Sequence, residues 1–98
     1  MEEEGKIYVG QTKLRLTVEC LADLTGATAQ VIKYIKPDES TGSFTAILPE
    51  AAKGDIYYDF QTDDLDMSGD WTFWSYITFA DGSVPGEAFT IHVYNEGE

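Results

Sequence analysis

Four aspartates lie close together in one connection of the chain: Asp63, Asp64, Asp66 and Asp70. Carboxylate oxygens at nearly alternate positions are ligands that Ca²⁺ takes in proteins, so this cluster is a candidate calcium site. The stretch lacks the residue order of an EF-hand loop. The alternative is a solvated loop in which the aspartate side chains cap turns and a short helix.

The other side chains with reactive groups do not form a catalytic set. His92 is the one histidine, so no second imidazole is present for a metal site of the nitrogen and sulfur type, and we expect an outward-facing strand residue beside Tyr94. Cys20 is the one cysteine, and it is predicted to act as a small buried hydrophobe. No serine elbow or phosphate-binding glycine loop occurs. We therefore predict no enzyme activity and no cofactor.

Aromatic residues carry more information about function. They make up 13% of the chain, and those left over once a core is filled are expected on outer faces, where large aromatics mark contact surfaces. The candidate interface residues are Tyr57, Trp74, Tyr76, His92 and Tyr94. Two alternatives stay open. The rings pair across strands and cover one another, or they stack on sugars.

The elements that carry these residues are predicted to be β-strands, because period-two alternation runs through the chain and no helical period is sustained. Clean alternation of apolar and polar residues is typical of antiparallel sheets with one buried face. The inward residues predicted for three strands are Leu14, Leu16, Val18 and Cys20 in 13–20; Ile56, Tyr58 and Phe60 in 55–61; and Phe89, Ile91 and Val93 in 88–94.

The strand predicted over 71–79 is apolar on both faces, since Trp74 and Tyr76 lie opposite its core side. Either both faces are covered, or the outer face carries an exposed aromatic patch. In 27–36 two registers compete, and we predict that Ile32 and Tyr34 point inward.

Turn signals separate about seven short strands, the number typical of an antiparallel immunoglobulin-like β-sandwich. We expect 43–48 to pair with 55–61 as a hairpin, and 63–67 to form one helical turn. One domain is predicted over 6–94, between a flexible acidic N-terminus at 1–5 and a flexible C-terminus at 95–98.

The charge balance excludes several classes of partner. Eighteen acidic residues against six basic ones give a formal net charge of −12 in 98 residues, a length that allows one domain. A chain of this sign repels nucleic acid and anionic membranes, so neither is expected as a partner. We expect no signal peptide in the acidic start, and no apolar run is long enough to span a bilayer. The single cysteine fits folding in a reducing cytoplasm.

Five turn-rich motifs follow one another along the chain, in an order and spacing that are informative together: Asp23–Thr28, Lys36–Asp38, Gly54–Tyr58, Asp64–Trp71 and Thr78–Gly82. Together they resemble a module common in bacteriophage virion proteins, the N-terminal immunoglobulin-like domain of baseplate upper proteins. The resemblance covers about Val9 to Val93, nearly the whole chain.

This resemblance implies a bacteriophage structural protein, a small subunit or adaptor on capsid, tail or baseplate that acts through protein–protein contacts. Its expected partners are other phage structural proteins and copies of itself, and its expected location is the virion, after synthesis in the host bacterial cytoplasm. The alternative function is an adhesin-like carbohydrate-binding module that uses the exposed aromatics. A DNA-mimicking inhibitor is a third class, but it needs regular rows of carboxylates, and the outward residues of 13–20 are mixed in charge.

Two residues depart from the family pattern. Trp71 stands where immunoglobulin-like folds usually place a corner tyrosine, and an indole donates a hydrogen bond but does not accept one. Glu39 stands where the family has glycine, so we expect the turn after Pro37 to change type or to lengthen through 40–42.

Overall fold

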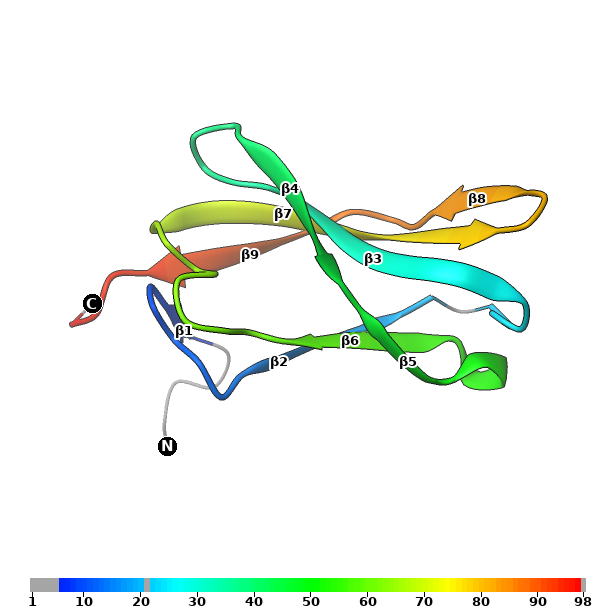
Figure 1. Cartoon of the computed structure of the whole chain (residues 1–98). Coiled ribbons are helices and arrows are strands. Elements are labelled where there is room, and N and C mark those ends of the chain that lie inside the picture. The colour runs from blue at the N-terminus through cyan, green and yellow to red at the C-terminus, as the bar shows by residue number, and fades with distance from the viewer. Residues whose placement is uncertain (1–5, 21, 98) are drawn as a thin grey trace.

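The structure is a computed structural model that describes residues 6–20 and 22–97. Its strands form two sheets packed face to face, and the described residues contain no α-helix (Figure 1). This confirms the predicted all-β sandwich. The flexible N-terminus predicted at 1–5 lies outside the described residues, as does Glu98 of the predicted C-terminal tail.

The larger sheet has six strands. Its order is β1 (Ile7–Tyr8), β9 (Phe89–Tyr94), β7 (Gly69–Phe79), β3 (Ala27–Ile35) and β4 (Thr41–Thr45), and β8 (Gly82–Pro85) also pairs with β7. Strand β3 pairs along one edge of β7. On the other edge, β9 pairs with residues 69–73 of β7 and β8 pairs with residues 76–79. The long strand β7 is therefore the centre of this sheet.

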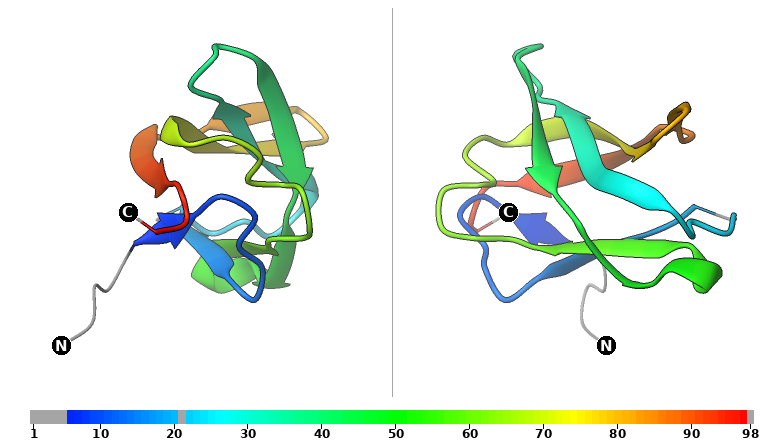
Figure 2. Two further views of the ribbon diagram at one scale, coloured as in Figure 1. Left: turned by 90° about the vertical axis from the view of Figure 1, so that its left-hand side faces the viewer. Right: turned by 45° about the vertical axis from the view of Figure 1, so that its right-hand side comes forward.

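The smaller sheet has three strands in the order β2 (Arg15–Glu19), β6 (Asp55–Asp59) and β5 (Ile47–Glu50), with the short 3₁₀ helix η1 (Ala51–Lys53) between β5 and β6. The predicted hairpin of 43–48 with 55–61 is correct for β5 alone, because β4 pairs with β3 in the other sheet. The chain passes from one sheet to the other at Ala46, which is buried and donates its N–H to the Gln30 carbonyl at 3.0 Å. Figure 1 shows β4 and β5 as one diagonal band across the sandwich, and the right-hand view of Figure 2 shows the same green band passing from one sheet to the other.

The core lies between the two sheets and takes the predicted inward residues. Ile32 is completely buried, and Tyr34 packs against the core, so the register chosen for 27–36 is correct. The buried apolar residues are Leu16, Val18, Leu24, Ile32, Phe44, Ala46, Ile56, Phe60, Leu65, Trp71, Phe73, Ile77 and Val93. Alternation was sufficient to assign the faces of the strands that supply this core, because each of them has one buried side.

The connection 60–68 contains turns and bends in place of the helical turn predicted at 63–67. Asp64 explains the difference. Its N–H bonds to the Gln61 carbonyl at 3.1 Å, while its carboxylate accepts the Gln61 N–H at 2.6 Å and the Tyr58 hydroxyl at 2.7 Å. These bonds fix a turn and leave no helical ladder.

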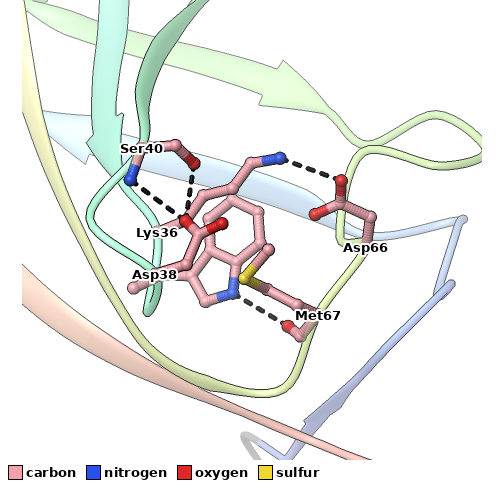
Figure 3. A network of polar contacts seen from close by, with 6 residues as sticks. Lys36, Asp38, Ser40, Asp66 and Met67 are labelled. Carbon is pink, nitrogen blue, oxygen red and sulfur yellow. Dashed lines mark hydrogen bonds and ion pairs between the residues drawn. The ribbon is translucent and has the colours of Figure 1, made fainter.

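Trp71 forms the corner hydrogen bond that a tyrosine usually makes in immunoglobulin-like folds. Leu65 and Trp71 are buried, and the indole Nε1 of Trp71 donates to the main-chain carbonyl of Met67 at 3.0 Å. An aromatic donor is all that this bond requires, so tryptophan replaces tyrosine here. Lys36 and Asp66 form an ion pair at 2.8 Å beside the ring (Figure 3), and this bond raises the pKa of Lys36.

The turn at Glu39 does not lengthen as predicted. Strand β4 begins at Thr41, and the Glu39 N–H bonds to the Lys36 carbonyl at 2.8 Å. Glu39 adopts φ = 72°, a left-handed conformation that glycine adopts freely. The Asp38 carboxylate holds the turn by accepting the N–H and hydroxyl of Ser40, which lowers the pKa of Asp38 (Figure 3).

Candidate interaction face

Trp74 and Tyr76 lie on the outer side of β7 and are half-buried, so strand 71–79 carries an aromatic patch on its outer face. On the adjacent strand β3, Lys33 pairs with Trp74, and Val31 pairs with Tyr76. The Lys33 Nζ lies 3.8 Å from the centre of the Tyr76 ring, and the Tyr76 hydroxyl contacts the Ser83 hydroxyl at 2.8 Å.

We call this surface the aromatic face. It consists of the outward residues of the central strands, Val31, Lys33, Ile35, Asp70, Thr72, Trp74, Tyr76, Thr78, Thr90 and His92. A shallow hollow of about 380 Å³ lies in it between Lys33, Trp74 and the outward side of β4. Neutral threonines surround the aromatic centre, a composition that suits contact with another macromolecule.

His92 and Tyr94 lie together at the β9 side of the larger sheet. The His92 Nδ1 is 2.7 Å from an Asp70 carboxylate oxygen, and the two rings of His92 and Tyr94 meet edge to face at 4.5 Å. Lys6 and Tyr8 also contact the Tyr94 ring. His92 and Tyr94 both belong to β9, so their contact runs along one strand, whereas the contact of Tyr8 with Tyr94 joins β1 to β9.

Tyr57 is not brought together with the other candidates. It lies on β6 in the smaller sheet, where the Arg15 guanidinium stacks on its ring at 3.8 Å. Arg15 also binds Asp59 through two bonds of 2.7 and 3.1 Å. This pair lowers the pKa of Asp59 and raises that of Arg15.

The four aspartates of the candidate calcium site do not converge. Asp64 caps the turn described above, Asp66 binds Lys36, and Asp70 binds His92. Asp63 lies in the turn at φ = 73°. No group of three or more potential metal-ligating side chains occurs within residues 6–20 and 22–97. The arrangement corresponds to the solvated, turn-capping loop.

Charge is distributed unevenly between the two sheets. Asp70 is the one acidic residue in the six strands of the larger sheet, while the three short strands of the smaller sheet carry Glu19, Glu50, Asp55 and Asp59. In a chain of net charge −12, the aromatic face is thus the surface from which acids are most nearly absent. The scarcity of acidic residues in the strands of 27–45 and 69–94 is present in the sequence. It can be recognised as a difference between two sheets only once each strand is assigned to its sheet.

No family model matches the chain, and no curated protein matches it. A solved structure does: CopC from Methylosinus trichosporium OB3b aligns with 97% of this chain and 89% of its own, at 11% identity and a TM-score of 0.62. At that identity the likeness shows the β-sandwich fold alone. No helix among the described residues has the length and apolar character to cross a bilayer.

These comparisons correct the function expected from the sequence. A bacteriophage structural protein was predicted, with a carbohydrate-binding module as the alternative, and the structural neighbour that contradicts this is CopC. Neither the family models nor the curated proteins point to a phage particle. The virion and glycan-binding functions are therefore not retained.

Proposed function

We propose that the protein is a non-enzymatic module that associates with a second copy of itself through the aromatic face. The main support for this proposal is the distribution of charge over the two sheets. Each copy has a net charge of −12, so two copies repel each other over most of their surfaces. Only one acid, Asp70, lies in the strands of the larger sheet, and it is bonded to His92. A second copy therefore approaches with least repulsion at this face.

The chemistry of the face supports the same partner. Trp74 and Tyr76 are half-buried at its centre, and aromatic residues are enriched where protein interfaces lose their water. The Lys33 ammonium lies over the Tyr76 ring and supplies the face with one positive charge. The molecule measures 46 Å by 31 Å along its longer axes, which leaves room for the roughly 800 Å² per partner of a standard interface.

The surroundings of the one imidazole support the non-enzymatic part of the proposal. His92 is exposed and faces Asp70 and Tyr94, and neither of these two partners is a serine, threonine or cysteine. An activated nucleophile needs its base within hydrogen-bond reach.

Sedimentation equilibrium of matched variants tests it. Trp74→Glu places an acid at the centre of the aromatic face and is expected to weaken association there. Ile47 is 50% exposed on β5, at the edge of the smaller sheet away from β2. Ile47→Glu likewise puts an acid in place of an apolar residue and is the control, expected to keep the wild-type association constant. Equal effects of the two variants, with both folded by circular dichroism, would overturn the proposal.

A further inference from the structure

Strand β2 lies at an open edge of the smaller sheet. Among the described strands it pairs with β6 alone. Immunoglobulin constant-type sandwiches have four strands in this sheet, the fourth lying beside the equivalent of β2. Here the first strand, β1, instead pairs in parallel with β9 in the larger sheet, with Ile7 opposite Val93. The place next to β2 therefore has no strand within residues 6–20 and 22–97.

The free edge of β2 presents backbone hydrogen-bonding groups. The Leu14 carbonyl accepts the Phe60 N–H, and the Cys20 N–H donates to the Gly54 carbonyl, both at 2.9 Å. Bonding residues alternate along an antiparallel pair. The N–H and C=O groups of Arg15, Thr17 and Glu19 consequently point away from β6, and such an edge is a template for another strand.

A groove runs beside this edge, with Glu19 and Glu87 among its lining residues and a mainly apolar part toward β8. One part, of about 540 Å³, lies between Thr17–Cys20 and the segment 86–89, and a second part, of about 260 Å³, extends toward β8. Val84 pairs with Ile77, whose side chain is in the core, yet Val84 is 54% exposed. The larger sheet therefore reaches beyond the cover that the smaller sheet provides.

A bulge shapes the far wall of the groove. Tyr76 pairs with Pro85 and Phe73 with Phe89, so three residues, 86–88, face two residues of β7. Such an insertion bends the strand and interrupts its pairing. Residues 86–88 of the bulge separate β8 from β9, and the groove lies between this segment and β2.

The edge of β2 is complementary to itself. Arg15 and Glu19 stand two residues on either side of Thr17, and both side chains point outward and are exposed. In an antiparallel pair centred on Thr17, Arg15 of one copy faces Glu19 of the other. Residues 15, 17 and 19 are also the ones with free backbone groups, so charge and hydrogen bonding favour the same register.

We propose that a second copy of this chain adds its own β2 to this edge, antiparallel and centred on Thr17. The two smaller sheets then become one continuous sheet across the pair. The Arg15 side chain can serve both partners, because Nε and Nη2 bind Asp59 while Nη1 takes no part in that bond. On the core-facing side of the new strand pair, Leu16 of one copy lies opposite Val18 of the other, beside the groove. This contact is separate from the aromatic face.

A charge-exchange series tests the pairing, made in a Trp74→Glu background so that the aromatic face contributes nothing. The background protein is expected to dimerise. Glu19→Arg places like charges opposite each other in the pair, and we expect at least a tenfold weaker dimer. The double variant Arg15→Glu/Glu19→Arg restores opposite charges, and with them the dimer. Glu50→Arg makes the same charge change on β5, at the other edge of the sheet, and is expected to leave the dimer intact.

Two further measurements guard against misfolded variants. Thr17→Pro removes an N–H that points away from β6, so the monomer keeps its ladder and the dimer is lost. An equimolar mixture of the Arg15→Glu and Glu19→Arg proteins is expected to form a heterodimer, although each alone is monomeric. A background protein that stays monomeric at its highest soluble concentration would overturn the proposal, as would a dimer insensitive to Glu19→Arg and Thr17→Pro. If Trp74→Glu leaves self-association unchanged, that result contradicts only the proposal for the aromatic face.

Discussion

Gly86 packs directly against Ser75 at the bulge between β8 and β9. Its N–H donates to the Ser75 carbonyl at 2.7 Å, and a Cβ at position 86 would collide with the Ser75 hydroxyl oxygen. Ser75 is 3% exposed, so its side chain has little room to move aside. This contact fixes where the strand leaves the sheet and therefore where the groove beside β2 opens.

The Gly86–Ser75 contact predicts coupled mutations. Gly86→Ala is expected to lower the free energy of unfolding by about 1–3 kcal/mol through overpacking. Ser75→Ala removes the hydroxyl that the new methyl group would meet, so the double variant should recover most of the loss. Urea unfolding in a double-mutant cycle measures the coupling. Additive effects of the two changes would contradict this account of the bulge.

The corner bond from Trp71 to Met67 predicts a large cost for a conservative change. Trp71→Phe removes a buried donor and part of a fully buried ring, and we expect a loss of about 2–4 kcal/mol in the free energy of unfolding. Trp74→Phe makes the same change at a half-buried position of the aromatic face and should cost less than about 1 kcal/mol. Chemical denaturation at protein concentrations low enough to keep the chain monomeric compares them. Equal costs would argue against the corner.

Glu39 predicts a stabilising substitution. At φ = 72° a side chain with a Cβ is strained, whereas glycine is not. Glu39→Gly is therefore expected to raise the free energy of unfolding by up to about 1 kcal/mol. Glu39→Ala retains the Cβ and is the matched control, for which no gain is expected. A thermal or urea unfolding curve distinguishes the two variants.

Tyr58 predicts a loss of stability in alkali. Burial of its ring, together with the hydrogen bond to Asp64, raises the pKa of Tyr58 to about 12. The unfolded chain releases this proton near pH 10, so the folded state holds it more tightly. The contribution of Tyr58 to stability is complete below pH 10 and is lost as the pH rises toward 12. Ultraviolet titration should show one phenol ionising near pH 12, absent in Tyr58→Phe. Without that step, the burial of this hydroxyl would be in doubt.

Local pattern was enough to predict the faces of most strands. Leu16, Ile32 and Phe73 each fall on the buried side, because alternation reports burial directly when one face of a sheet is wet. The outer face of β7 could not be decided from sequence. Trp74 and Tyr76 fit either a covered or an open surface. In the structure both are half-buried, with Lys33 over the Tyr76 ring, and no further sheet lies on that face among the described residues.

Long-range organisation accounts for what local pattern missed. The chain segment around Ala46 changes sheets, a property set by packing between β4 and β5 and not by the residues of either strand. The self-complementary edge of β2 is another such property. Arg15 and Glu19 are visible in the sequence as a mixed outward face, but their meaning depends on which side of β2 stays unpaired. Charge segregation between sheets likewise requires the topology.

The most direct test of self-association is the mass of the unmodified protein by sedimentation equilibrium at several salt concentrations. The monomer is 10.9 kDa with a charge of −12, and raising the salt from about 0.01 M to 0.1 M shortens the screening length from about 30 Å to 10 Å. We predict an average mass above the monomer that increases with protein concentration and, because repulsion between copies is screened, with salt. A mass of 10.9 kDa at every concentration and every salt would contradict the account.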